Sequence, residues 1–182
     1  MSDPALHDFT EGSRHAWGPL TTELVDTCRR RLEVLLRAPA DEPWLAGLCR
    51  DMPDSRELYR DPEHGFVLQA HAEAGGRYRP PHDHGRSWVI YGVRHGEVEM
   101  GAWVRVEDPE GRVRLVRRGL TRLRAGDAQV YLPGDIHDTR CLSEQALLFR
   151  FTERDLRAED REHGRVRRYV ERNGVWTPSG AA

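Results

Sequence analysis

A series of short β-type segments in the middle of this 182-residue chain constrains its fold more than any other feature. The segments are rich in Val, Ile, Tyr and Trp, are separated by Gly, Pro and Asp, and cover residues 65–72, 87–93, 97–106, 113–123, 129–132 and 147–151. Asp108-Pro109-Glu110-Gly111 predicts a hairpin turn between two of them. Strands and turns at such regular spacing indicate an antiparallel sandwich or barrel.

The region before the strands has helical periodicity. Apolar residues three or four positions apart predict an amphipathic helix that begins near Leu20 and ends at Pro39: Leu24, Cys28, Leu32, Leu35 and Leu36. Pro43 to Arg50 predicts a second, shorter helix with Pro in its first turn. Residues 1–18 are polar and lack periodicity, which predicts a flexible arm.

A chain of this length forms one domain with one core, so we expect one site and no cleft between domains. Within a single domain over residues 19–182, we expect a helical part over 19–61, a barrel over 62–152 and an extension over 153–182. The charged segment Glu153 to Arg168 is either helical or irregular. The tail after Asn173-Gly174 is expected to be frayed.

Composition argues against several classes of protein. The net charge is -2, so nucleic acid and anionic membranes are not expected partners. All 28 basic residues are arginine, which excludes a lysine Schiff base and a phosphate-binding Gly-Lys pair within this sequence. The three cysteines form no Cys-x-x-Cys pair, which argues against a disulfide framework or a thiolate zinc site. With no apolar run of membrane-spanning length, we expect a cytoplasmic protein.

Three histidines are the candidate metal ligands. His82 and His84 are two positions apart on an extended segment, so both imidazoles point to the same side and can reach one metal ion. His137 is the third candidate, because a closed barrel can bring its strand alongside the first pair. Alone, a His-x-His pair is a weak signal, since exposed or hydrogen-bonded histidines also produce it.

The residues around these histidines resemble the two motifs of the cupin superfamily. The first motif, Gly-x5-His-x-His-x4-Glu-x6-Gly, aligns with Gly76, His82, His84, Val89 and Gly96. The second, Gly-x5-Pro-x-Gly-x2-His-x3-Asn, aligns with Gly126, Leu132, Gly134, His137 and Cys141. The resemblance implies a mainly β fold, a cupin double-stranded β-helix barrel preceded by two or three α-helices. Cys141, in the place of the motif's asparagine, is expected to be a small buried residue.

One departure from the motifs points to a branch of the superfamily. Val89 stands where most metal cupins have a glutamate ligand, which leaves three neutral imidazoles. That set resembles the three-histidine iron centre of the cysteine dioxygenase-like thiol dioxygenases, and it implies Fe(II) as the cofactor. Three ligands on one face leave room for substrate and dioxygen.

Two arginines are candidates to bind the acidic end of a substrate. Leu58-Tyr59-Arg60 resembles the Tyr-x-Arg segment of cysteine dioxygenases, which implies a carboxylate clamp by Arg60 beside Tyr59; the alternative is a surface arginine. The Ser-x-His-x-Tyr network of that family is absent, since Leu148, Arg150 and Thr152 occupy its positions. Arg150 either points inward and binds an acidic substrate or faces solvent between two phenylalanines.

Two further residues are candidates for positions around the metal. His71 precedes the metal-binding segment and either orients a ligand or is a structural histidine. Tyr91 is either a core residue or a phenol that takes part in proton transfer near the metal.

Together these features predict an iron(II) dioxygenase that uses dioxygen to oxidise a small acidic thiol to its sulfinate. One alternative is a three-histidine oxygenase that acts on carbon, of the diketone-cleaving type. Another is a non-catalytic cupin that binds a metal or a sugar. The sequence indicates no oligomeric interface.

Overall fold

The computed structural model describes residues 3–179. The chain begins with α1 (Pro4–Ala16), α2 (Thr22–Leu35) and α3 (Pro43–Asp51). The strands of the barrel follow: β1 (Arg56–Arg60), β2 (Val67–Ala74), β3 (Tyr78–His82), β4 (Val89–His95), β5 (Glu97–Glu107), β6 (Val113–Arg124), β7 (Ala128–Tyr131), β8 (Ile136–Cys141) and β9 (Gln145–Thr152). A short helix, α4 (Leu156–His163), leads to the hairpin of β10 (Tyr169–Arg172) and β11 (Val175–Pro178).

Local signals in the sequence explain where the helices begin. The Thr21 hydroxyl accepts a hydrogen bond from the Leu24 amide at 3.1 Å and caps α2. Pro43 occupies the first turn of α3, where its missing N–H is not needed. The Asp155 carboxylate accepts from the amides of Arg157 and Ala158 at the start of α4. The helices expected before the barrel are therefore present as α2 and α3, and the segment after it contains a helix.

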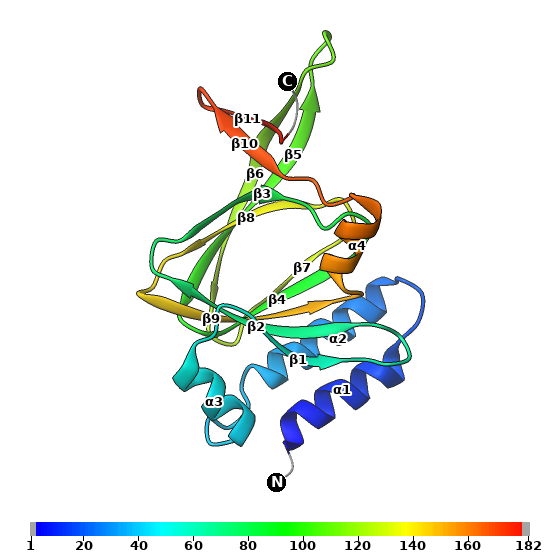
Figure 1. Ribbon diagram of the computed structural model, residues 1–182, viewed down its shortest axis with the longest axis vertical. Coiled ribbons are helices and arrows are strands. Elements are labelled where there is room, and N and C mark those ends of the chain that lie inside the picture. The colour runs from blue at the N-terminus through cyan, green and yellow to red at the C-terminus, as the bar shows by residue number, and fades with distance from the viewer. Residues whose placement is uncertain (1–2, 180–182) are drawn as a thin grey trace.

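The barrel consists of two antiparallel sheets that face each other (Figure 1). One has the order β1-β2-β9-β4-β7 and the other the order β3-β8-β5-β6. From β2 to β9 the chain crosses from sheet to sheet at each strand, except at the β5–β6 hairpin, where Gly111 and Asp108 close the predicted turn. This winding is the double-stranded β-helix of the cupins, as the sequence predicts.

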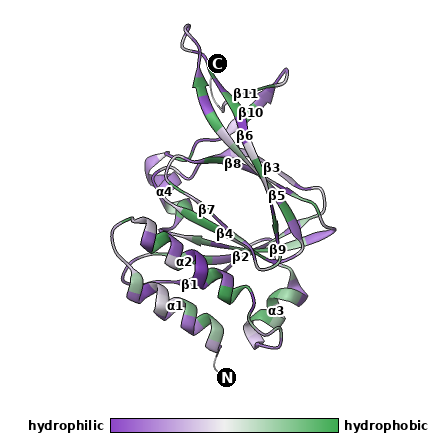
Figure 2. Cartoon of the chain, turned by 180° about the vertical axis from the view of Figure 1, so that it is seen from behind, coloured by the Kyte–Doolittle hydropathy of each residue, from purple (hydrophilic) through white to green (hydrophobic). Residues whose placement is uncertain are grey.

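The N-terminal helices cover the outer face of the five-stranded sheet (Figure 1). They are amphipathic and show alternating hydrophobic and hydrophilic bands in Figure 2. Phe149 and Phe151 of β9 pack against them, whereas Ala146 and Leu148, which alternate with them, face the barrel interior. Because both faces of β9 are buried, the residues of this strand form an almost continuous apolar run.

The flexible arm expected over residues 1–18 is a correction: residues 4–16 form α1, and residues 1 and 2 lie outside the described part of the chain. Phe9 packs edge to face against Phe151, with ring centroids 5.2 Å apart. Trp17, just after the helix, lies 4.6 Å from Phe66 in the same core. Helix α1 therefore has an apolar side, formed by Ala5, Leu6 and Phe9, that was not recognised in the sequence.

The tail after Asn173-Gly174 is also a correction, because Val175–Pro178 form β11 and pair with β10. Trp176 of β11 packs near Trp103 and Tyr78 on the four-stranded sheet. The β-type segments recognised in the sequence do not include β1, β3 or β8, and β3 contains Pro80-Pro81, which is unusual within a strand. None of the helices between residues 3 and 179 is long and apolar enough to cross a membrane.

Candidate metal centre and cavity

The three histidines of the two motifs meet at one point inside the barrel. His82 ends β3, His84 lies in the loop that follows, and His137 is the second residue of β8. The antiparallel pairing of β3 and β8 makes His82 and His137 register partners. One ring nitrogen of each histidine lies within 4.8 Å of those of the other two, and the Nε2 atoms of His84 and His137 are 3.0 Å apart.

Contacts around the cluster fix the orientation of its rings. The Nδ1–H of His82 donates a hydrogen bond to the Pro80 carbonyl at 2.9 Å, which leaves the Nε2 lone pair of this ring free to bind a metal. The Tyr131 ring stacks on His137 at 4.0 Å. Nδ1 of His137 is buried and has no hydrogen-bond partner within residues 3–179.

The three imidazoles are neutral donors at physiological pH. Burial lowers the pKa of His84 to about 2, and it lowers the pKa values of His137 and His82 below the ordinary range. A metal ion binds the unprotonated form of imidazole, so burial removes competition from protons. Three nitrogen donors on one side of a site suit a divalent transition metal and leave its other positions open. The residues present therefore fit a metal ion.

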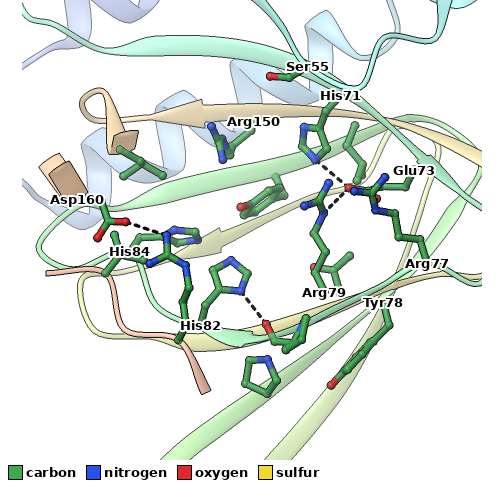
Figure 3. Close-up of a pocket in the computed structure, with 18 of the residues that line it drawn as sticks. Ser55, His71, Glu73, Arg77, Tyr78, Arg79, His82, His84, Arg150 and Asp160 are labelled. Atoms are coloured by element: carbon green, nitrogen blue, oxygen red, sulfur yellow. Dashed lines mark hydrogen bonds and ion pairs between the residues drawn. The ribbon is translucent and has the colours of Figure 1, made fainter. Parts of the chain in front are cut away.

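A cavity of about 660 Å³ opens beside the histidines (Figure 3). His82 and His84 form part of one wall, and Gln69, His71 and Arg150 of the facing sheet contribute another. Leu156 of α4 and Tyr169 of β10 close part of the cavity. The segment after the barrel therefore contributes to the site.

Three polar residues lie in register on the face of the five-stranded sheet that lines the cavity. Gln69 of β2 and Tyr91 of β4 are both register partners of Arg150, which lies between them on β9. The Arg150 guanidinium donates to the Gln69 amide oxygen through Nη2, and its Nε has no hydrogen-bond partner among the described residues. Of the two directions open for Arg150 from sequence, the structure shows the inward one.

The pKa of Tyr91 is raised by burial, and the positive charge of Arg150 opposes this effect. Its ring centroid lies 5.2 Å from that of His137 and 5.9 Å from that of His84. Tyr91 is thus a neutral phenol between the histidine cluster and Arg150.

A buried carboxylate, that of Glu73, contacts two arginines and a histidine in the wall of the cavity. Glu73 of β2 is 2% exposed, and its Oε1 accepts from Nε of Arg79 at 2.5 Å. Nε of Arg77 lies 3.3 Å from Oε2 of the same carboxylate, and Nε2 of His71 lies 3.7 Å from Oε1 (Figure 3). Burial, with smaller contributions from nearby arginines, lowers the pKa of His71 to about 3, so this ring is neutral.

The loop that carries His84 is tied to the segment after α4. Asp83, between two of the histidines, is 5% exposed, and its Oδ1 accepts from the amides of Gly85 and Arg167 at 3.0 and 2.9 Å. The Asp83 amide donates to the Arg167 carbonyl at 3.0 Å. An added Cβ on Gly85, whose φ is +62°, would lie 3.2 Å from Arg165, so the two segments are in close contact.

The predicted substrate clamp at Arg60 is not in this cavity. Its exposed guanidinium pairs with Glu57 at 2.6 Å and with Asp155 at 2.9 Å, so it ties β1 to the start of α4. The Tyr59 hydroxyl donates to Asp61 at 3.0 Å and contacts Arg14 of α1. Arg60 thus makes its contacts at the protein surface, and Tyr59 makes its contacts with the helical layer. Both residues belong to β1, the edge strand that is farthest from β4 in the five-stranded sheet.

Sequence reasoning identified the histidines, Arg150, His71 and Tyr91 but missed Gln69, Glu73, Arg79 and Asp83. A signal for two of them is present in β2, where Gln69, His71 and Glu73 alternate with small or apolar residues and therefore share one face. Arg79 lies on β3, which was not among the predicted β-type segments. Cys141 is buried and contacts the carbonyls of Glu73 and Ser143, in agreement with the expected small buried residue.

Comparison with known proteins supplies structural neighbours but no family. No protein-family model and no curated protein matches the chain. The cupin domain of Cnp3 from Schizosaccharomyces pombe aligns over 61% of this chain and 66% of its own length, with 11% identity and a TM-score of 0.44. KdgF from Halomonas sp. aligns over 54% and 74%, with 22% identity and a TM-score of 0.41.

An oxalate oxidase solved with the substrate analogue glycolate aligns over 56% of this chain and 51% of its own, with 22% identity and a TM-score of 0.42. The chain thus matches less than two thirds of the length of both this protein and the Cnp3 domain. Identities this low concern the fold alone. The strand order and register of the chain itself establish its double-stranded β-helix.

Proposed function

We propose that this protein is a mononuclear non-haem iron(II) dioxygenase that oxidises a small acidic thiol to its sulfinate. The observation that carries the proposal is a cluster of three neutral imidazoles, two of which, His82 and His84, line a cavity that Arg150 also lines. His82, His84 and His137 would hold the iron, and the cavity would admit a small organic anion together with dioxygen.

Iron(II) held there would supply the redox chemistry that a reaction between a thiol and dioxygen needs. In the overall reaction both atoms of dioxygen become bonded to sulfur and the O–O bond breaks. Sulfur supplies all the electrons, so no external reductant is required. The absence of a carboxylate from the ligand set favours an anionic substrate, since three neutral ligands leave the charge of the metal uncompensated.

Of the two arginines that the sequence offers for the acidic end of the substrate, Arg150 is the one that lines the cavity. Guanidinium groups bind carboxylates through paired, charge-assisted hydrogen bonds. Gln69 holds one terminal nitrogen of Arg150 from β2, which fixes the guanidinium in the wall of the cavity. A carboxylate bound at Arg150 would direct the other end of a small molecule past Tyr91 toward the histidines.

Tyr91 is suited to donate a hydrogen bond within the site. Burial raises its pKa, so the phenol keeps its proton at physiological pH. On β4 it is the register partner of Arg150, the residue that stands in place of the histidine of the Ser-x-His-x-Tyr network. Its role in the proposal is to orient substrate or dioxygen and to hold a proton beside the histidines.

Oxygen uptake by protein reconstituted anaerobically with Fe(II) tests the function. The substrates are cysteine, 3-mercaptopropionate, mercaptosuccinate and pentane-2,4-dione, and product mass is measured after reaction under ¹⁸O₂. Uptake with a thiol, with two labelled oxygen atoms in a sulfinate, supports the proposal. Uptake with the diketone alone would favour the carbon-oxidising alternative.

Iron content and uptake are measured in parallel for His84→Ala and for Arg60→Gln, a surface variant. The first variant should lose both properties, whereas the second should keep both. Stoichiometric iron without turnover of any substrate in the panel would favour the non-catalytic alternative. Iron content unchanged in His84→Ala would refute the site.

A further inference from the structure

The walls of the cavity carry more positive than negative charge. Five arginines line it: Arg77, Arg79, Arg150, Arg157 and Arg168. Three carboxylates line it: Asp54, Glu73 and Asp160. The arginines of the lining thus outnumber its carboxylates by two, which favours a ligand with more than one negative charge.

Two of the five arginines project into the cavity from opposite sheets. Arg150 projects from β9 of the five-stranded sheet, and Arg79 projects from β3 of the four-stranded sheet (Figure 3). Both arginines line the cavity together with His71 and Tyr91. The Arg79 side chain is 41% exposed.

Glu73 holds Arg79 in a way that leaves it able to bind an anion. The contact at 2.5 Å uses Nε of Arg79, and neither terminal nitrogen has a partner among the described residues. The carboxylate itself is 2% exposed, so it is fixed within the sheet. Glu73 therefore acts as a positioning residue that orients the free edge of Arg79.

We propose that the substrate of this cavity carries two carboxylates, one bound by Arg150 and the other by Arg79 as Glu73 positions it. This inference rests on the proposed function. It identifies the substrate class as small thiols with two carboxylates, for which mercaptosuccinate is the probe. Arg79 is then the specificity-determining residue, since it discriminates such thiols from those with one carboxylate.

Binding of sulfur-free acids tests this inference separately from thiol oxidation. Calorimetric titration of the metal-loaded protein compares succinate with propionate. One additional charge-assisted contact corresponds to about tenfold or more in affinity, so succinate should bind at least that much more tightly. Arg79→Gln should remove the difference while leaving propionate binding unchanged, whereas Arg150→Gln should weaken both ligands.

Glu73→Gln should lower the ratio of the two affinities without changing propionate binding, which a general loss of structure would not do. Arg60→Gln, a surface arginine that also pairs with a glutamate, is the matched control and should keep the ratio. Equal affinities for succinate and propionate, or a ratio that survives Arg79→Gln, would overturn the inference.

Turnover separates the two proposals. A higher kcat/KM for mercaptosuccinate than for 3-mercaptopropionate, lost in Arg79→Gln through KM, supports both. Equal turnover of the two thiols retains the dioxygenase and refutes the two-carboxylate site. Selective binding of succinate without oxidation of any thiol retains the two-carboxylate site and refutes the thiol dioxygenase.

Discussion

His82 and His137 are register partners in the antiparallel pair of β3 and β8. The pairing brings together two segments that are far apart in the sequence, and His84 completes the cluster from the loop after β3. The relationship exists only when the barrel is closed. Metal binding and barrel stability are therefore linked, since the unfolded chain does not hold the three nitrogens together.

His137→Ala should remove this linkage. In the wild-type protein a metal concentration 100 times the dissociation constant adds about 2.7 kcal/mol to the free energy of unfolding. The variant should show no such gain, as measured by thermal unfolding with and without Fe(II) under anaerobic conditions. His95→Ala removes an exposed histidine at the end of β4 and is the matched control. An equal gain in His137→Ala and the wild type would contradict the assignment.

Arg150→Gln should weaken substrate binding far more than Arg60→Gln. Loss of a hydrogen bond to a charged group costs about 1.5–3 kcal/mol, which corresponds to an increase in KM of about 10- to 150-fold. The exposed pairs of Arg60 contribute about 0–1 kcal/mol to stability, and Arg60 is not among the residues that line the cavity. Steady-state oxygen uptake against thiol concentration measures both variants. A similar KM in all three proteins would refute the role of Arg150.

The sequence predicted the barrel, α2, α3 and the histidine cluster because each has a local signature. Helical periodicity marks α2, and the two glycines that flank the first motif, Gly76 and Gly96, adopt positive φ angles of 75° and 81°. The inward direction of Arg150 was left open, because β9 is buried on both faces and its alternation is hidden. Only contacts with the helices distinguish the two faces.

The clamp at Arg60 was predicted from a short resemblance, which carries no information on where the arginine lies relative to the cavity. Placement of β1 at the edge of its sheet turns Arg60 toward Glu57 and Asp155. The cluster around Glu73 was missed for a related reason. Arg79 and Glu73 come from different sheets, and no pattern within either strand reveals that they meet.

Asp83→Ala should lower metal affinity by about 10- to 100-fold, the usual effect of removing a residue that orients metal ligands. Its carboxylate holds the loop between His82 and His84 through the amides of Gly85 and Arg167. Asp108→Ala is the matched control, because Asp108 also accepts from two backbone amides, in the β5–β6 turn. Competition with a chromogenic chelator measures affinity. Equal losses in the two variants would indicate a general effect of loop loosening.

His71→Gln should flatten the dependence of stability on acid pH. The pKa of His71 is about 3 in the folded protein, whereas that of an unfolded histidine is about 6.5. Between these values the unfolded state binds a proton that the native state does not, so the native state is destabilised as pH falls below 6.5.

A buried histidine whose pKa is lowered in this way changes the free energy of unfolding by up to about 1.4 kcal/mol per pH unit. The His71→Gln variant should lack the contribution of His71 to this pH dependence. Urea unfolding of metal-free protein from pH 7.5 to 4.5 measures the slopes. His95→Gln serves as the matched control for removing an imidazole. Equal slopes for the wild type and His71→Gln would contradict the neutral, buried state of this ring.

Gly92→Ala should destabilise the protein because α2 lies directly against β4. A Cβ at Gly92 would lie 2.6 Å from Cδ1 of Leu36 and 3.1 Å from Cδ2 of Leu32, both of which belong to the core. Leu36 is 1% exposed and Leu32 is fully buried, so neither side chain has free space into which it can move. Overpacking of this kind costs about 1–3 kcal/mol.

Gly119→Ala in β6 is the matched control, since an added Cβ there meets nothing within 4 Å. Alanine in place of glycine within a strand stabilises by about 0.5–1 kcal/mol when space is free, so the two variants should shift the urea midpoint in opposite directions. Because Gly92 follows Tyr91 on β4, iron affinity is measured as well. A midpoint for Gly92→Ala at or above that of the wild type would show that α2 can move away from the barrel, and an unchanged iron affinity would show that this movement does not reach the histidines.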